Sequence, residues 1–297
     1  MVNLEFIINT LSLGSLYAML ALGLVIVYGI LRLVNFAYGE LIMIGGYTLY
    51  LLTGFTPLPW LFIAFLAVIV SMLTSLATEL VAFRPVREKS LTAMLITSFA
   101  VSTLLQNAAL LIISPRARAV TLPRIFQQSV LIAGTDVPWR NILTILTCLV
   151  MLALLTLLLK RTVLGIALRA AADNFRMTRM LGVPANTVIS SAFAISGIMA
   201  GVVSIFWIAR SASVTPTLGA PPLLVAFVAT VIGGMRSLTG AVVGGFVYAI
   251  IISLLGIFLP PDLLEFREAF MFVFVIIVLL FRPEGLIRSK TSVERVG

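Results

Sequence analysis

The densest group of ionisable side chains lies between Lys160 and Pro184, and apolar runs long enough to cross a bilayer flank it on both sides. Arg169 and Asp173 are four residues apart, and Asp173 and Arg176 are three apart, so both pairs would share one face of a helix. The chemistry that this spacing supports is charge pairing and the docking of an acidic partner. The alternative interpretation is a solvated connector between two spans.

The end of this polar stretch carries a helix stop signal. Gly182 suits the residue just past a helix C-terminus, and Pro184 prevents the helix from continuing. We therefore expect a short, exposed, cationic helix, followed at once by the next membrane span.

A second group of polar residues, Asn35 and Glu40, lies where another apolar run begins. Glu40 falls about one turn inside that run, where a carboxylate is unfavourable. It could line or gate a transport pathway. Its structural alternative is to pair with Arg32 or to cap the span, where a carboxylate complements the helix dipole.

Other polar side chains inside apolar runs have simpler interpretations. Glu79, near the end of the third run, is expected to pair with a basic neighbour or to reach water. A polar series in the fourth run is expected to form hydrogen bonds between helices. That series comprises Ser98, Ser102, Gln106 and Asn107.

The chain lacks the usual groups of catalysis. It has no histidine, its one cysteine, Cys148, lies in an apolar run, and it has no phosphate-binding Gly-x-x-x-x-Gly-Lys-[Ser/Thr] motif. We therefore expect no catalytic site, no metal and no cofactor, and any use of ATP must come from another subunit.

Composition and hydropathy indicate the elements that position these residues. The chain is 61% hydrophobic and 10% charged, whereas soluble domains carry about 25% charged residues. This predicts an all-α, polytopic transmembrane helix bundle with about 8–9 spans, formed by residues 1–297 as one domain. The expected spans are 6–31, 36–54, 60–83, 91–113, 141–159, 188–209, 223–233, 241–259 and 266–281.

Basic residues predict the orientation. With residues 160–187 in the cytoplasm, alternation of the spans places 14 of the 20 basic residues on that side. The N-terminus is then external, and residues 282–297 form a cytoplasmic tail. The longest polar interval, 114–140, becomes a folded external loop whose apolar insert could be partly re-entrant.

Two segments share one order of features. Residues 26–39 and 231–244 each run from an apolar span through glycine and arginine to small residues. Internal repeats of this kind often flank a pathway, so Gly233 and Gly234 join Asn35 and Glu40 as pathway or gate candidates. Two unrelated helical hairpins would look similar.

Three motifs resemble the permease subunits of ABC importers for branched-chain amino acids. They are Asn35-Phe-Ala-Tyr-Gly-Glu40 with Gly46-Tyr47, Leu168-Arg-Ala-Ala-Ala-Asp-Asn174 leading to Leu181-Gly-Val183, and the stretch Val231–Gly245. Family members often carry histidine where this chain has Tyr38, so a titratable role there does not transfer.

The resemblance implies a multi-pass protein of the bacterial cytoplasmic membrane. Its partners would be a second, homologous permease, two cytoplasmic ATPases and an extracytoplasmic binding protein, with no role for nucleic acid. Residues 160–187 would be the loop that couples to the ATPases, and its small residues, arginines and one apolar anchor would make the contact. The candidate coupling residues are Arg169, Ala171, Ala172, Asp173, Phe175, Arg176, Arg179 and Gly182.

Two other functions stay open at this point. Related permeases for urea or short amides share the motifs. An ion-coupled secondary transporter is the alternative from another class, although such proteins usually carry several acidic residues in mid-membrane, and here only Glu40 and Glu79 come close.

Overall fold

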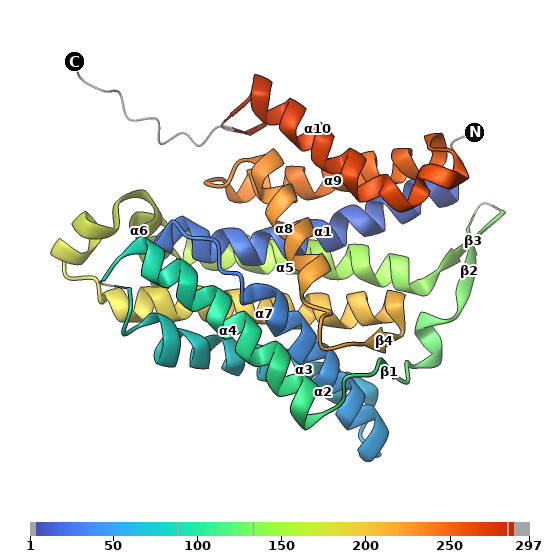
Figure 1. Ribbon diagram of the computed structural model, residues 1–297, viewed down its shortest axis with the longest axis horizontal. Coiled ribbons are helices and arrows are strands. Elements are labelled where there is room, and N and C mark those ends of the chain that lie inside the picture. The colour runs from blue at the N-terminus through green and yellow to red at the C-terminus, as the bar shows by residue number, and fades with distance from the viewer. Residues whose placement is uncertain (1–3, 88, 133, 284, 288–297) are drawn as a thin grey trace.

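The computed structural model describes residues 4–87, 89–132, 134–283 and 285–287 as a helical bundle (Figure 1). Most of the basic tail expected at 282–297 lies outside the described residues. The helices are α1 (Leu4–Leu31), α2 (Tyr38–Phe55), α3 (Trp60–Thr78), α4 (Leu91–Ile112), α5 (Trp139–Arg161), α6 (Val163–Met180), α7 (Ala185–Ser211), α8 (Ala220–Gly233), α9 (Leu238–Phe258) and α10 (Arg267–Phe281).

Each of the nine expected apolar segments forms a helix, and the polar stretch forms α6. Within the described ranges, six helices are long and apolar enough to cross a membrane: α1, α3 with the turn that continues it to Phe83, α4, α5, α7 and α9. Helix α8 is apolar but shorter, with 14 residues. The helical membrane fold is therefore confirmed, while the count of eight or nine spans stays a prediction.

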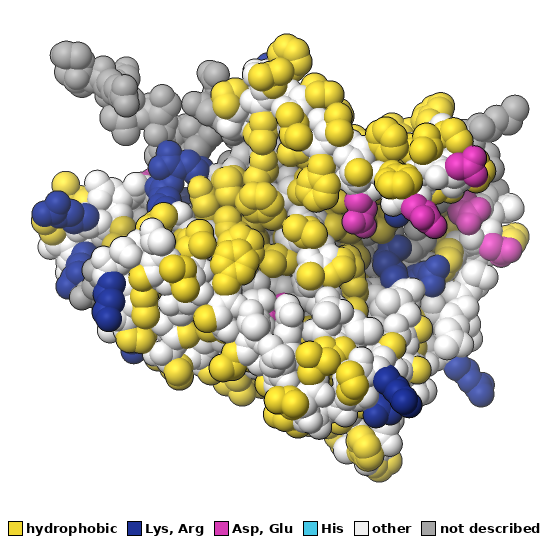
Figure 2. All heavy atoms as spheres, in the orientation of Figure 1, with side chains coloured by type: hydrophobic (Ala, Val, Ile, Leu, Met, Phe, Trp, Pro, Cys, Tyr) yellow, Lys and Arg dark blue, Asp and Glu magenta, His cyan; other side chains and the backbone are white. Residues whose placement is uncertain are grey.

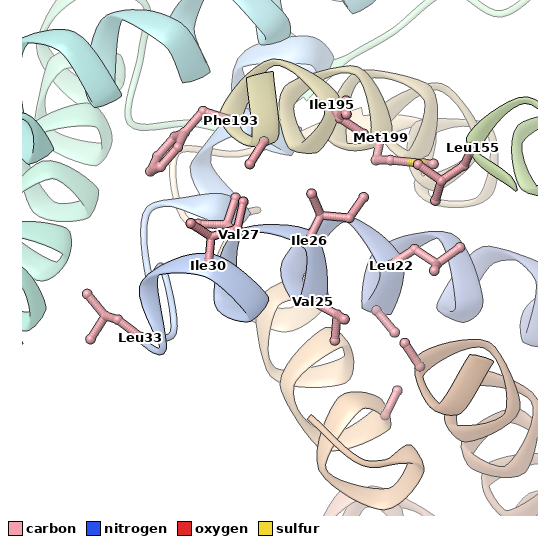
Figure 3. Close-up of a cluster of buried hydrophobic side chains, with 14 of the residues drawn as sticks. Leu22, Val25, Ile26, Val27, Ile30, Leu33, Leu155, Phe193, Ile195 and Met199 are labelled. Atoms are coloured by element: carbon pink, nitrogen blue, oxygen red, sulfur yellow. The ribbon is translucent and has the colours of Figure 1, made fainter. Parts of the chain in front are cut away.

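Helices α1 and α7 form the centre of the bundle. Both are mostly buried, whereas most residues of α4 and α5 face outward. Figure 3 shows Leu22 and Ile26 of α1 beside Met199 of α7 and Leu155 of α5. Because α1 also contacts α8 and α9, its side chains pack against neighbours all around it.

Small residues bring the helix backbones together. A Cβ atom added to Gly201 of α7 would lie 2.6 Å from the Cα of Val68 in α3, and one added to Gly197 would lie 2.7 Å from the Cα of Met72. Gly197 and Gly201 are four residues apart, a small-residue spacing from which the sequence predicts close approach of two helices. The structure confirms it, with α3 as the partner. In lipid this contact matters because apolar burial gives helices little drive to associate.

The outer surface is apolar in the middle and charged at both ends. Figure 2 shows hydrophobic side chains across the centre, basic side chains near α6 and most of the visible acidic ones at the opposite end. Leu61 and Leu111 are 80% and 87% exposed, as expected of side chains that face lipid. Helices α1, α5 and α7 run between these ends (Figure 1).

Four short strands lie at the end of the bundle away from α6. β2 (Ser129–Ile132) pairs antiparallel with β3 (Thr135–Pro138) as a hairpin, and β1 (Arg118–Ala119) pairs with β4 (Ser213–Val214). The apolar insert of the 114–140 interval is therefore a strand of a hairpin and not a re-entrant segment. We call this end the hairpin end and the opposite one the α6 end.

Gly201→Ala should lower the stability of the bundle, because the new methyl group meets the α3 backbone. Overpacking of this kind costs about 1–3 kcal/mol. Gly54→Ala is the matched control, since nothing lies within 4 Å of a Cβ at that exposed helical position. Thermal unfolding in detergent should show a lower midpoint for Gly201→Ala alone. Equal midpoints for the two variants would contradict the packing account.

Candidate functional site: the α6 surface and the Glu40 cluster

Helix α6 begins and ends as the sequence predicts. The Thr162 hydroxyl oxygen accepts a hydrogen bond from the Gly165 amide at 3.0 Å and caps the first turn. The helix ends at Met180, and Gly182 follows with a φ of +85°, the left-handed region that favours glycine. Pro184 then precedes α7, so the stop signals at Gly182 and Pro184 are confirmed.

The helix is kinked, which the sequence analysis did not anticipate. Asn174 has φ −146° and ψ 93°, outside the helical region, and its side-chain oxygen accepts a hydrogen bond from the Met177 amide at 3.0 Å. Asn174 thus caps a second, short helical piece. Asparagine favours such caps because its side chain competes with the backbone for hydrogen bonds.

The kink corrects the expected charge pairing. Asp173 and Arg176 lie on opposite sides of Asn174, so the three-residue spacing no longer places them on one face. Arg169 and Asp173 line the same cavity beside α1. In the described part of the chain they form no ion pair with each other. These exposed charges are therefore not neutralised by each other at contact distance.

Arg32, just past the end of α1, holds α6 in place. Its guanidinium donates a hydrogen bond to the Ala172 carbonyl at 2.6 Å, directly before the kink. Arg32 itself has a φ of +56°, which is unusual for a residue other than glycine. Burial, together with the nearby Arg236 charge, lowers the pKa of this guanidinium from its usual value. From the sequence, Arg32 is expected as a possible partner of Glu40, and nothing there indicates this contact with α6.

The small residues of α6 face the bundle, and most of its charged and apolar candidates face out. Ala171 is buried, and Ala172 packs beside Gly29 of α1, where an added Cβ would lie 3.7 Å from the Ala172 Cβ. Most of the other candidates are exposed, and Phe175 is half-buried. The exposed ones are Arg169, Asp173, Arg176, Arg179 and Gly182.

A cavity of about 520 Å³ lies beside α6, between the ends of α1, α4 and α7. Phe175 and Arg179 line it from α6, and Arg87 lines it from the loop before α4. Arg87 also reaches Asn186 of α7 and lies 3.9 Å from the Glu79 carboxylate. The α6 end therefore presents a hollow with basic side chains next to an exposed helix.

Glu79 is paired, as expected. It begins the π-helical turn η1 (Glu79–Phe83) and is fully buried. Arg84 donates to both of its oxygens at 3.3 and 3.1 Å, and the Ser190 hydroxyl donates to Oε2 at 2.8 Å. This network joins the end of α3 to α7 close to the start of that helix.

Glu40 does not pair with Arg32 and is instead held by α4. It lies in the first turn of α2 and is 1% exposed. Its Oε1 accepts hydrogen bonds from the Gln106 side-chain amide at 2.7 Å and the Ser102 hydroxyl at 3.0 Å. We call Glu40, Ser102 and Gln106 the Glu40 cluster. It confirms the expected interhelical bonds at Ser102 and Gln106, whereas Ser98 and Asn107 bond within α4.

The surroundings of the Glu40 cluster are tightly packed. The Tyr38 ring is fully buried, and its hydroxyl lies against Gly23 of α1, while Gly39 contacts the Gly219 backbone just before α8. Gly23 is eight residues, or about 12 Å, from the end of α1, so α2 begins well inside the bundle. Glu40 Oε2 lies beside Gly219 and has no hydrogen-bond partner within the described ranges.

The remaining pathway candidates are held in turns. The Asn35 side chain is buried and accepts a hydrogen bond from the Ala37 amide at 3.1 Å, which shapes the turn into α2. Gly233 packs against the Gly240 backbone in the α8–α9 hairpin, and Gly234 has a φ of +108°. These contacts explain the residue types structurally; a pathway role for them stays a prediction.

The fold and these polar sites define a multi-pass helical membrane protein with a structured polar helix at one end. Among the described residues, no group of three or more histidine, cysteine or acidic side chains could hold a metal ion.

Comparison with known proteins gives the family. Residues 6–281 match the family model described as the permease component of branched-chain amino acid transport systems. The chain is 32% identical to the high-affinity branched-chain amino acid transport permease BraD of Pseudomonas aeruginosa, over 99% of this chain and 98% of that one. LivH of Escherichia coli, described in the same terms, is 31% identical over 99% of this chain and 97% of that one. The chain belongs to this permease family and is a multi-pass protein of the inner membrane.

Gln106→Leu should release α4 from the bundle, because it removes one of the two donors to a buried carboxylate. Hydrogen bonds to charged groups contribute about 1.5–3 kcal/mol. Asn107→Leu is the matched control, since the Asn107 side chain is exposed and bonds only to its own helix. We expect Gln106→Leu to lower the unfolding midpoint and to increase proteolysis at the ends of α4. The idea fails if Asn107→Leu has the same effects.

Proposed function

We propose that the chain is the membrane-spanning subunit of an ATP-driven importer that moves branched-chain amino acids into the cell. In this proposal it is not itself an enzyme, and it works with two cytoplasmic ATPases, a second permease and an extracytoplasmic binding protein. The family match over nearly the whole chain and the printed roles of BraD and LivH support this assignment.

The proposal includes an orientation. The α6 end faces the cytoplasm, the hairpin end faces outward, and the chain crosses the membrane eight or nine times with its N-terminus outside. The charge distribution supports this orientation, because basic residues are concentrated at cytoplasmic ends. The short helices α2, α8 and α10 would complete the spans beyond the six long ones.

Helix α6 is the proposed docking surface for an ATPase. The observation that carries this role is the hydrogen bond from Arg32 to Ala172, which fixes an otherwise exposed helix to the central helix of the bundle. Met177 and Met180 are 55% and 69% exposed and would supply apolar anchors, while Arg169, Arg176 and Arg179 would face acidic residues of the partner.

The same contacts suggest how force would travel. Closure of the ATPases on ATP would push α6, and Arg32, together with the contact between Gly29 and Ala172, would pass that displacement to α1. The chain also joins α6 directly to α5 and α7. The Glu79 network lies beside the start of α7 and would stiffen it.

The polar residues inside the bundle are proposed to lie near the pathway. Glu40 keeps one carboxylate oxygen without a partner where α2 and α8 begin, and a buried acidic group of this kind in a membrane protein is a functional candidate. Asn35, Gly233 and Gly234 would control the turns on either side of it.

Reconstituted transport tests the proposal. Proteoliposomes that contain the permeases, the ATPases and the binding protein should accumulate leucine only with ATP, and an ionophore should leave uptake unchanged. Urea or acetamide should not compete. Uptake that the ionophore abolishes would instead identify an ion-coupled transporter.

Two charge-reversal variants, one on α6 and one at the hairpin end, separate a loss of docking from general effects of charge. Arg176→Glu on α6 should lose co-purification of the ATPases and most ATP-dependent uptake. Arg124→Glu makes the same change at an exposed position of the hairpin end and should retain both. If Arg176→Glu also retains both, α6 is not the docking surface.

A further inference from the structure

Arg210 lies in the last turn of α7 at the hairpin end and has only neutral hydrogen-bond partners. Its Nη2 donates to the Ser12 hydroxyl of α1 at 2.6 Å and to the Asn141 side-chain oxygen of α5 at 3.3 Å. Its Nε is buried and has no hydrogen-bond partner among the residues that the structure describes. Among the described residues, no carboxylate forms an ion pair with Arg210.

A half-buried guanidinium without an anion is unfavourable unless something compensates its charge. Ser12 and Asn141 are themselves buried, and they orient the side chain without neutralising it. Of the groups that act on it electrostatically, Tyr17 favours the charged guanidinium and Arg140 opposes it. The arginine therefore braces three helices, and within the described part of the chain it keeps a donor and a charge without a partner.

A cavity of about 250 Å³ lies directly beside this guanidinium. Its volume is smaller than the roughly 300–1,000 Å³ of drug-sized ligand sites. The cavity therefore suits a small solute. Its wall is mostly apolar and aromatic, with one cationic group, Arg210, and the hydroxyls of Tyr17 and Ser211. The lining residues are Leu13, Leu16, Tyr17, Trp207, Arg210 and Ser211.

We propose that Arg210 and this cavity form an entry subsite that binds the carboxylate of a small aliphatic amino acid. The guanidinium matches a carboxylate in charge and geometry, and Leu13, Leu16 and Trp207 match an aliphatic side chain. The inference rests on the proposed function, because it is this transport direction that makes the hairpin end the side of entry. It adds a recognition step within the permease to whatever selection occurs before the solute arrives.

The binding test uses the purified permease–ATPase complex in detergent and ligand-observed NMR. Saturation transfer to leucine should be clear for the wild-type protein and weak for leucinamide, which keeps the side chain and the amine but has no carboxylate. Arg210→Gln should weaken leucine binding at least about tenfold, as expected for the loss of a charge-assisted contact. Arg210→Lys should retain part of it, and Arg124→Gln should bind as the wild type does.

Several outcomes would overturn the subsite. Equal signals for leucine and leucinamide in the wild-type protein would overturn it even if Arg210→Gln proved unstable. Unchanged leucine binding in a folded Arg210→Gln protein would also overturn it. Displacement of leucine by millimolar inorganic phosphate would indicate a general anion site, such as one for a lipid headgroup, and would overturn the specificity for a carboxylate.

The transport assay distinguishes this failure from failure of the proposed function. If leucine uptake is ATP-driven but binding does not depend on Arg210, the subsite is wrong and the function stands. If binding depends on Arg210 but no branched-chain amino acid is transported, the subsite stands and the proposed function is wrong.

Discussion

Helix α1 occupies the centre of the bundle, and its packing determines where the surrounding helices lie. It contacts α5, α6, α7, α8 and α9, and its small residues let those neighbours approach closely. Gly23 admits the Tyr38 ring, Gly29 admits α6, and the backbone at Ala18 meets Gly245 of α9. In a bilayer, where apolar burial does little to join helices, such close contacts and hydrogen bonds hold the elements together.

Three buried or half-buried charges illustrate how this bundle treats polar groups. Glu79 forms ion pairs with Arg84 at 3.1 Å and Arg87 at 3.9 Å, and Glu40 accepts hydrogen bonds at one oxygen from the outer helix α4. Arg210 has neutral partners only. The ion pairs of Glu79 give it a structural explanation. Glu40 and Arg210 each keep a polar atom without a hydrogen-bond partner among the described residues, so they are the better candidates for contact with a transported solute.

The sequence predicted the apolar helices, the polar helix with its stop at Gly182, and the Gly197 and Gly201 contact, because each leaves a local signal in hydropathy or residue size. It failed where the outcome depends on distant partners. Nothing local indicates that Arg32 reaches Ala172, 140 residues away, or that α4 supplies the donors to Glu40. The kink at Asn174 could have been anticipated, since Asp173-Asn174 is a poor helical pair and asparagine is a common cap.

We propose that α6 and α1 move as one body when the partner ATPases bind ATP. Spin labels at Ile7 and Met180 would report it, because both positions are exposed and the native Cys148 is buried. The distance between the labels, measured by pulsed electron paramagnetic resonance in the assembled complex, should be the same without nucleotide and with ATP trapped. In Arg32→Gln the distribution should broaden. A shift of several ångströms in the wild-type protein on ATP binding would contradict the account.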